Sequence, residues 1–361
     1  MRIAYLCADR GVAVGSGTGA SVRVTEIVTA LALQGAEVLL LPGSVVDGFD
    51  ELPREVTVEA LPASEGDAAL ADWLEERLRG VGAEALYERL ALHTAAGATV
   101  ARRLGIPHLV ELNAPLLEET ARYRSVADAE HVAELEEAVL TSADAVLAVS
   151  GPLARYARAR GATHVEVLPN AVDLDRFPAP SQVREPRCVF LGALRPWEGV
   201  DVLAAGWRLL GREAPPLLVI GDGVGRAALE AVGAEVTGAV PHGEVPQLLA
   251  SASIGLAPYA RDAPGYLSPL KLFEYLAAGL AAVAGSIEGV REVVGPEHVA
   301  LASPGDPEAL AEAVRTLAAD ERTRARLGSA GRELVAAHHT WDRRARRILT
   351  LAYQLAPAAV A

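Results

Sequence analysis

The hydrophobic residues of this chain gather into short runs that are separated by amphipathic stretches. Residues 3–7 form an apolar run, and a glycine-rich loop follows it. Residues 20–34 then carry apolar side chains at helical spacing, and residues 37–41 form a second apolar run. A strand, a helix and a strand in this order make a βαβ unit, so the pattern predicts a parallel sheet.

The same alternation continues to the end of the chain. Further strands are expected at residues 83–87, 108–111, 144–150, 165–168, 188–191, 217–220, 236–240, 254–258 and 280–284. Helices are expected at residues 72–79, 95–104, 129–141, 152–160, 245–251 and 341–353, with two more between 306 and 337. Residues 174–186 contain three prolines, which is typical of a linker. The chain is therefore expected to form two α/β domains.

Composition excludes several classes of protein. A chain of 361 residues with 51% hydrophobic residues can bury two cores, and a net charge of −14 argues against a general nucleic-acid binder. Cys7 and Cys188 lie in apolar runs, which favours free thiols in a reducing compartment and hence a cytoplasmic protein. The first apolar run ends at Asp9, so no signal peptide is expected. Neither a metal-ligand cluster nor a membrane span is expected from the sequence.

The stretch 263–294 carries the clearest candidate chemistry. Ser268 and Pro269 are expected to begin a helix, because serine can cap a helix and proline suits its first turn. A loop that enters a helix leaves free backbone N–H groups, which favour an anion. Lys271 in the first turn opposes the helix dipole, so a nearby phosphate would explain it. Glu274, one turn later, could then accept hydrogen bonds from hydroxyl groups of the same ligand. An ordinary amphipathic helix with solvated charges is the alternative.

Two further candidate stretches follow or close predicted strands of the first domain. The loop with Gly17 and Gly19 fits a relaxed dinucleotide pattern, although no acidic residue ends the second strand. A plain surface loop and an NAD-dependent dehydrogenase are therefore both alternatives. Glu111 and Asn113 lie at the end of another strand, where open α/β sheets place ligands. A polar turn that caps a helix is the alternative there.

The segment SPLKLFEYLAAGLAAVA at residues 268–284 resembles the donor-binding motif of retaining glycosyltransferases of family 4, which have the GT-B fold. The resemblance implies that the segment 268–271, including Leu270, holds the donor diphosphate and that Glu274 binds hydroxyl groups. It also implies that the glycine-rich loop faces the donor phosphates and that the segment of Glu111 and Asn113 lines the acceptor side.

Other segments carry the same resemblance in the same order. Residues 169–173 resemble the turn that ends the first domain of that family, which gives domains at 1–173 and 187–339, a linker at 174–186 and a helix at 340–361 that returns to the first domain. Gly221 lies in a Gly-Asp-Gly turn like the one in the family. Val240 ends a stretch that resembles the strand beside the nucleotide base.

The chain also departs from the family pattern at three positions. Ala193 and Glu198 stand where the family has a diphosphate-binding Arg and Lys, and Tyr266 stands where it has the first of two glutamates. Glu198 must therefore turn away, pair with a cation, or meet an unusual donor. Arg195 and Lys271 are expected to supply the positive charge instead, and loss of activity is the alternative.

The resemblance implies a metal-independent hexosyltransferase-like enzyme that moves a sugar from a nucleotide-diphosphate sugar to an acceptor with retention at the anomeric carbon. Its donor is a substrate, most simply a UDP- or GDP-sugar, and no cofactor is expected. A sugar-nucleotide epimerase and a non-catalytic nucleotide-sugar-binding protein are the alternatives. Four arginines at residues 343–347 leave open a peripheral membrane contact of the last helix, with a solvated face as the simpler interpretation. The sequence does not specify the base, the sugar, the acceptor or the oligomeric state.

Overall fold

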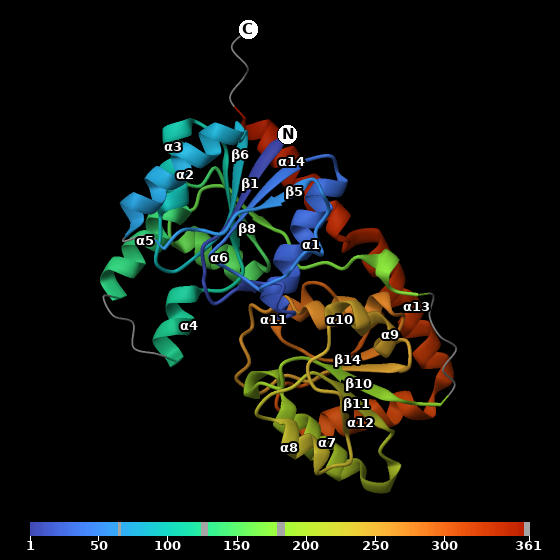
Figure 1. Cartoon of the computed structure of the whole chain (residues 1–361). Helices are drawn as coiled ribbons and strands as arrows, with labels where there is room; N and C mark the ends of the chain where they lie inside the picture. The colour runs from blue at the N-terminus through green and yellow to red at the C-terminus, as the bar shows by residue number, and fades with distance from the viewer. Residues whose placement is uncertain (64–65, 124–128, 179–184, 357–361) are drawn as a thin grey trace. The chain divides into compact units, whose positions relative to one another are not determined.

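The computed structural model describes residues 1–63, 66–123, 129–178 and 185–356, with the side chains of 121–123 left out. These residues divide into two compact units. Unit 1 comprises residues 1–169 and 341–361, and unit 2 comprises residues 170–340. Figure 1 shows both units, with the chain coloured from its N-terminus to its C-terminus.

Unit 1 is built on a parallel sheet, as the alternation of hydrophobic runs predicts. Its strands, within the described residues, lie in the order β5-β3-β1-β6-β7-β8-β9. Their bounds are β1 (Arg2–Cys7), β3 (Glu37–Pro42), β5 (Val56–Val58), β6 (Ala85–Arg89), β7 (His108–Leu112), β8 (Ala145–Ala148) and β9 (Val165–Val167). A small separate pair joins β2 (Ala13–Val14) to β4 (Ser44–Val45). From β1 the chain proceeds to β3 and β5 on one side of β1, and it then crosses to β6 on the other side.

Helices cover both faces of this sheet (Figure 1). They are α1 (Gly19–Leu33), α2 (Asp67–Val81), α3 (Ala96–Leu104), α4 (Leu116–Tyr123), α5 (Ala129–Ser142), α6 (Gly151–Ala159) and α14 (Trp341–Leu355). Ala4 and Leu6 of β1 face the core beneath α2 and α3. The intervening Tyr5 faces the side of α1 and α14, which pack against each other. The alternation along β1 therefore places Ala4 and Leu6 under one helix layer and the hydroxyl-bearing Tyr5 under the other.

Unit 2 has the same kind of architecture. Its parallel strands, in the part of the chain described, lie in the order β12-β11-β10-β13-β14-β15. They are β10 (Cys188–Leu191), β11 (Leu217–Ile220), β12 (Glu235–Val236), β13 (Ile254–Ala257), β14 (Ala281–Gly285) and β15 (Ala300–Ala302). The helices are α7 (Val200–Leu210), α8 (Arg226–Glu230), α9 (Val245–Leu249), α10 (Leu270–Ala277), α11 (Glu288–Arg291), α12 (Pro307–Ala319) and α13 (Glu321–His338). Short 3₁₀ turns lie at η1 (Leu174–Arg176), η2 (Pro196–Glu198), η3 (Gly211–Glu213) and η4 (His242–Glu244).

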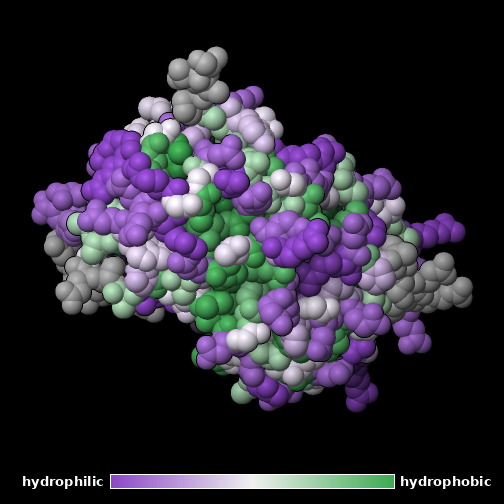
Figure 2. Space-filling view, turned by 45° about the horizontal axis from the view of Figure 1, so that its top comes forward, coloured by the Kyte–Doolittle hydropathy of each residue, from purple (hydrophilic) through white to green (hydrophobic). Residues whose placement is uncertain are grey.

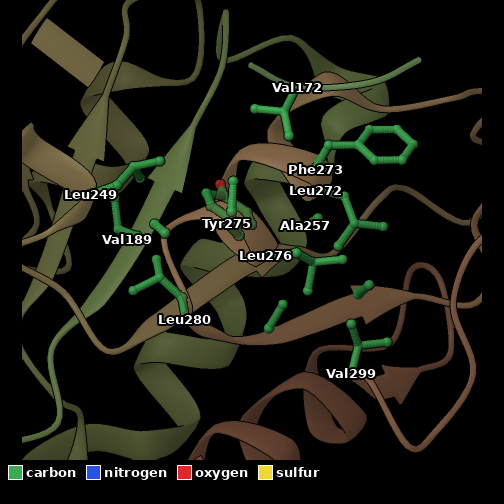
Figure 3. Close-up of a cluster of buried hydrophobic side chains, with 14 of the residues drawn as sticks. Val172, Val189, Leu249, Ala257, Leu272, Phe273, Tyr275, Leu276, Leu280 and Val299 are labelled. Carbon is green, nitrogen blue, oxygen red and sulfur yellow. The ribbon is translucent and has the colours of Figure 1, made fainter. Parts of the chain in front are cut away.

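Helix α10 is buried on nearly every side. Residues 271–277 are all buried, and Leu272, Tyr275 and Leu276 lie in a hydrophobic cluster with side chains from β10, β13 and α9 (Figure 3). Tyr275 also fixes the helix to the sheet, because its hydroxyl accepts a hydrogen bond from the Leu191 N–H at 2.8 Å and donates one to the Leu256 carbonyl at 3.1 Å. Lys271 and Glu274 therefore sit on a helix with little freedom to move.

The structure corrects two expected elements. The helix expected at 72–79 is longer, since α2 begins at Asp67. The Asp67 carboxylate accepts hydrogen bonds from Thr94 Oγ1 and the Ala95 N–H, which ties the start of α2 to the segment before α3. The strand expected at 236–240 ends at Val236, because Gly238 has a φ of +80°. The carbonyl of Gly238 then accepts a hydrogen bond from the Gly221 N–H at 3.0 Å, which continues the contact without a strand.

The division between the units falls a few residues before the expected boundary at residue 173, since Asn170 already belongs to unit 2. Part of the expected linker, residues 179–184, lies outside the described residues. In the described part of the chain, no helix has the length and apolar character that crossing a membrane would need.

The last helix does not present its arginines as a free basic face. Arg344 is buried and its Nε donates to the Pro169 carbonyl at 2.7 Å. Arg347 donates to Glu166 and Arg346 to Asp342. Hydrophilic residues cover much of the face of the molecule shown in Figure 2.

Candidate functional site

The strand order of unit 2 places a topological switch point between β10 and β13. From β10 the chain proceeds to β11 and β12 on one side, and it then crosses to β13 on the other. The loops after the two central strands therefore diverge at the carboxyl edge of the sheet, which is where open α/β sheets bind ligands. These loops are residues 192–199 after β10 and residues 258–269 after β13, and the second leads directly into α10.

The start of α10 differs in detail from the expected cap. Pro269 is the N-cap residue, and no side chain of the described residues caps the helix. Ser268 is buried and accepts a hydrogen bond through its Oγ from the Asn170 N–H at 3.0 Å. The Asn170 amide in turn donates to the Ser268 carbonyl. Ser268 therefore fixes the loop before the helix, and this leaves the first-turn N–H groups without a serine hydroxyl as their acceptor.

Lys271 has a partner within the protein, although its place in the first turn of the helix suggested that only a ligand would supply one. Its Nζ lies 3.1 Å from Glu198 Oε1, and the two side chains are 10% and 16% exposed. The same Nζ lies 4.2 Å from the centre of the Phe190 ring, a favourable cation–π distance. Of the three possibilities for Glu198, the structure shows pairing with a cation. The second carboxylate oxygen, Oε2, is buried without a hydrogen-bond partner in the described structure.

Two glycines allow the loops at this edge to approach each other closely. A Cβ on Gly192 would lie 2.6 Å from both Lys271 Nζ and Glu198 Oε2. A Cβ on Gly221 would lie 1.9 Å from the Gly192 carbonyl oxygen. Gly221 was expected to let the backbone approach a nucleotide, but the close approach that the structure shows is to Gly192. Its role toward a ligand stays a prediction.

Backbone strain marks the same edge. The described non-glycine residues with positive φ are Leu194, at +49°, and Tyr259, at +56°. One lies in each loop of the switch point, and a Cβ on Gly199 would lie 2.7 Å from the Tyr259 backbone. Such conformations are costly and tend to occur at functional sites. The Tyr259 hydroxyl is buried without a partner among the described residues, and its pKa is raised by burial and by the nearby Glu198.

Glu274 is paired with a residue that the sequence analysis did not identify. Its Oε1 lies 2.6 Å from Nε2 of His242, which belongs to the 3₁₀ turn η4. Glu274 is nearly buried, whereas the His242 side chain is 24% exposed. The expected partners of Glu274 were ligand hydroxyls, and its second oxygen remains for them. His242 precedes Glu274 by 32 residues, so no local pattern indicated the pair.

The remaining predicted residues of the donor side are more exposed. Arg195 is exposed, with its guanidinium 5.0 Å from the Trp197 ring. Val240 is half-buried and packs against the cluster around α10. In unit 1, a Cβ on Gly17 would have no atom of the described residues within 4 Å, and Gly19 is the first residue of α1. Their ligand-binding roles stay predictions.

Unit 1 has its own switch point, between β1 and β6, and a buried carboxylate lies beside it. Glu111 belongs to β7 and is fully buried. Its Oε1 accepts hydrogen bonds from Arg89 Nη1 at 2.9 Å, Asn113 Nδ2 at 2.7 Å and Tyr5 Oη at 3.3 Å. Its Oε2 accepts from Arg23 Nη2 at 2.9 Å and Tyr87 Oη at 2.5 Å.

The charge state of Glu111 follows from these partners. Burial alone would raise the pKa of its carboxyl, but the guanidiniums of Arg23 and Arg89 lower the pKa to about 2. Glu111 is thus a buried anion near neutral pH, with both oxygens occupied. Asn113 contacts Glu111, and Glu111 is inside β7 rather than at the end of the strand, where it was expected. A direct catalytic role for Glu111 stays a prediction, and its geometry suits the positioning of its neighbours.

The described residues contain no cluster of His, Cys, Asp and Glu that could hold a metal ion. Cys7 and Cys188 are both buried free thiols. Burial raises the pKa of the Cys7 thiol to about 12, so it is not a reactive thiolate near neutral pH.

Two family models match the chain, one for each unit. Residues 17–176 match the model described as Glycosyltransferase Family 4. Residues 185–320 match the model described as Glycosyl transferases group 1. The two matches together include β6 of unit 1, the switch point of unit 2 and the whole of α10.

Similar curated proteins come from two bacteria. A glycosyltransferase of teichuronic acid biosynthesis from Bacillus subtilis is 28% identical over 185 residues, which are 48% of this chain and 46% of that protein. A GDP-mannose-dependent α-(1-6)-phosphatidylinositol monomannoside mannosyltransferase from Mycobacterium tuberculosis is 29% identical over 214 residues, which are 52% of this chain and 56% of that protein. The match thus spans about half the length of these curated relatives.

Solved structures match over nearly the whole chain. Sucrose-phosphate synthase from Thermosynechococcus elongatus has a TM-score of 0.79 at 20% identity and covers 98% of this chain and 99% of its own. HepE from Anabaena, solved in complex with UDP, has a TM-score of 0.77 at 17% identity, with 98% and 100% covered. At these identities the likeness establishes the fold alone. With a family model on each unit and this agreement in fold, the chain belongs to the glycosyltransferases of family 4 and has the GT-B fold.

Proposed function

We propose that this protein is a retaining glycosyltransferase that transfers a sugar from a nucleotide-diphosphate sugar to an acceptor. The observation that carries the proposal is the start of α10, where Lys271 and Glu274 lie one turn apart on a rigid, buried helix. One of them can meet a phosphate and the other a hydroxyl group, which are the two parts that such a donor presents side by side.

The leaving group explains why this arrangement suits the reaction. Negative charge grows on the diphosphate as the glycosidic bond breaks and the sugar becomes oxocarbenium-like. Fixed donors at the helix start and the ammonium group of Lys271 would stabilise that charge, and each such contact is typically worth a few kcal/mol in a transition state. This supports transfer without a requirement for a divalent cation.

Retention at the anomeric carbon is the finer part of the proposal. In such a mechanism the departing phosphate itself accepts the proton of the acceptor, so no side-chain base is needed. Glu111 supports this view, because a carboxylate with five hydrogen-bond donors and a pKa of about 2 is a poor base. Asn113, at the carboxyl end of β7, can orient the acceptor instead.

A binding assay can identify the nucleotide base of the donor. Thermal unfolding with UDP, GDP, ADP, CMP, dTDP and NAD would show which ligand stabilises the protein, since a ligand at a hundred times its Kd adds about 2.7 kcal/mol. UDP and GDP are the first to test, because HepE was solved with UDP and the mycobacterial relative is named GDP-mannose-dependent. We expect stabilisation by one nucleoside diphosphate and its loss in Glu274→Gln.

The matched control is Glu297→Gln, because Glu297 also lies beside a histidine, at 3.3 Å from His298 Nδ1, but is 63% exposed. Turnover of the corresponding nucleotide sugar with an acceptor panel, in EDTA and in Mg²⁺, then tests transfer and the metal requirement. NMR of the product reports its anomeric configuration. Stabilisation by NAD alone would overturn the proposal, turnover without an acceptor would indicate an epimerase, and binding without turnover would indicate a non-catalytic binding protein.

A further inference from the structure

The carboxyl edge of the sheet in unit 1 carries an arginine that is only partly used. Arg89 is the last residue of β6, next to Cys7 of β1 in the register and next to Glu111 of β7. It therefore lies at the switch point of this unit, where the loops after β1 and β6 diverge. Its side chain keeps 12% of its surface exposed.

The guanidinium of Arg89 has unused donors. It contacts Glu111 through Nη1, and no described residue accepts a hydrogen bond from its Nε or Nη2. An arginine has five N–H donors in a rigid planar fork, and Nε with an adjacent Nη matches the two oxygens of a phosphate or carboxylate. The contact with Glu111 holds one side of this fork and leaves another side for an oxyanion.

The carboxylate that pairs with Arg89 is shared with a second cation. Glu111 carries one negative charge and shares it between two guanidiniums, those of Arg23 and Arg89. The other groups that contact or adjoin Glu111 are neutral near pH 7, because burial raises the pKa values of Tyr5 and Tyr87 well above the ordinary range. An additional anion at the exposed side of Arg89 would therefore be electrostatically favoured.

Asn113 adds the second element of a subsite. Its Nδ2 donates to Glu111 Oε1 at 2.7 Å. A carboxylate accepts hydrogen bonds only, so the amide nitrogen must face it and the amide oxygen must face away. That oxygen has no partner among the described residues, and Asn113 is half-buried just beyond the end of β7. It can accept a hydrogen bond from a hydroxyl group.

From this arrangement we propose that Arg89 and Asn113 form an acceptor subsite that binds an oxyanion, a phosphate or carboxylate, next to a hydroxyl group. Glu111 is the positioning residue that holds both side chains. The inference rests on the proposed function, because it assigns the bound group to the acceptor, but the subsite is testable without the donor. The acceptor class is then an anionic sugar or a phosphorylated alcohol rather than a neutral sugar.

The test is calorimetric titration of the full chain with three probes that share a polyol part. Glucose 6-phosphate carries a phosphate, glucuronate carries a carboxylate, and glucose is the neutral control. We expect the wild-type protein to bind at least one anionic probe at least tenfold more tightly than glucose. The better of the two anions indicates whether the acceptor carries a phosphate or a carboxylate.

Variants then locate the site. Arg89→Gln should bind the anionic probe at least tenfold more weakly than wild type does. Arg89→Lys, which keeps the positive charge but loses the planar fork of donors, should bind it at least threefold more weakly. Arg103→Gln is the matched control, because Arg103 also pairs with carboxylates, Asp72 and Glu75, but lies 40% exposed on the outer surface of unit 1. Asn113→Ala should weaken every probe, because the amide oxygen serves the hydroxyl group.

A titration of Lys271→Gln distinguishes this subsite from an anion bound in unit 2, because the proposal expects no change there. Melting temperatures identify any variant that fails to fold. If Arg89→Gln fails to fold, Arg89→Lys still tests the role of Arg89. The proposal is overturned if no anionic probe binds more tightly than glucose, if the Arg89 variants bind like wild type, or if only Lys271→Gln loses binding. Absence of any nucleotide effect on melting would refute the proposed function without affecting this result.

Discussion

Replacing Glu198 with glutamine tests how the ion pair at the start of α10 controls nucleotide binding. The Lys271 Nζ and the Glu198 Oε1 are 3.1 Å apart, and both side chains are largely buried. At an effective dielectric constant of 20, two unit charges at this distance attract by about 5 kcal/mol. An incoming diphosphate must therefore compete with Glu198 for the ammonium group, and it also meets the negative charge of the carboxylate.

The size of the effect follows from the same relation. A phosphate that contacts Lys271 would lie roughly twice that distance from the carboxylate, where the repulsion is about 3 kcal/mol at the same dielectric constant. Solvent and salt reduce this value near the surface, so we expect Glu198→Gln to bind a nucleoside diphosphate about tenfold more tightly than wild type does, equivalent to about 1.4 kcal/mol. Lys271→Gln should bind it at least tenfold more weakly.

The assay is calorimetric titration with UDP and GDP at low and high salt, together with the melting temperature. Glu198→Gln should lower stability, because breaking a largely buried pair is costly, while it raises affinity. Glu235→Gln is the control, since Glu235 pairs with Arg187 at 2.8 Å but is 70% exposed. Weaker binding by Glu198→Gln would refute the reasoning and would mean that the carboxylate itself contacts the ligand.

Three further predictions concern stability, each measured by urea unfolding. Because the pKa of Glu111 falls from 4.5 to about 2 on folding, its ionisation stabilises the protein by about 3 kcal/mol above pH 4.5. This stabilisation is lost as the pH falls toward 2, and Glu111→Gln should abolish that part of the pH dependence; equal slopes for both proteins would contradict the reasoning. Tyr275→Phe should cost about 1–3 kcal/mol, because the Leu191 N–H and the Leu256 carbonyl lose their partner. Tyr259→Phe removes a buried hydroxyl for which the described part of the chain offers no partner, so it should be neutral or stabilising by up to about 1 kcal/mol. A loss as large as that of Tyr275→Phe would contradict this.

The sequence predicted the features that depend on local patterns, but it did not predict the contacts between residues that lie far apart in the chain. The strands and most helices followed from apolar runs and helical spacing, because each element buries its own apolar face. Lys271 was singled out because it opposes the helix dipole in the first turn of α10, and Glu274 because it lies one turn later. Their partners lie 73 and 32 residues away in the chain, and Ser268 bonds to a residue 98 positions away. Such pairs depend on the strand order, which hydrophobic periodicity does not specify.

The carboxylate network of unit 1 shows the same limit. Glu111 and Asn113 were singled out because they follow a predicted strand. Both oxygens of Glu111 are occupied by side chains from β1, β6 and α1 and by Asn113, which required the parallel order β1-β6-β7. Arg89 was not identified, because an arginine at the end of an apolar run looks like an ordinary solvated charge.

The discontinuous composition of unit 1 has a consequence for biosynthesis. Helix α14 packs on α1, and its buried Ile348 and Leu351 belong to unit 1 although they are translated after all of unit 2. At about 5–20 residues per second, a ribosome needs on the order of 10–30 s to synthesise the intervening unit. During this time the α1 surface that α14 will cover is exposed on the nascent chain. Unit 2 can therefore complete its fold before unit 1, the reverse of the usual vectorial order, and a fragment ending at residue 169 would lack its last helix.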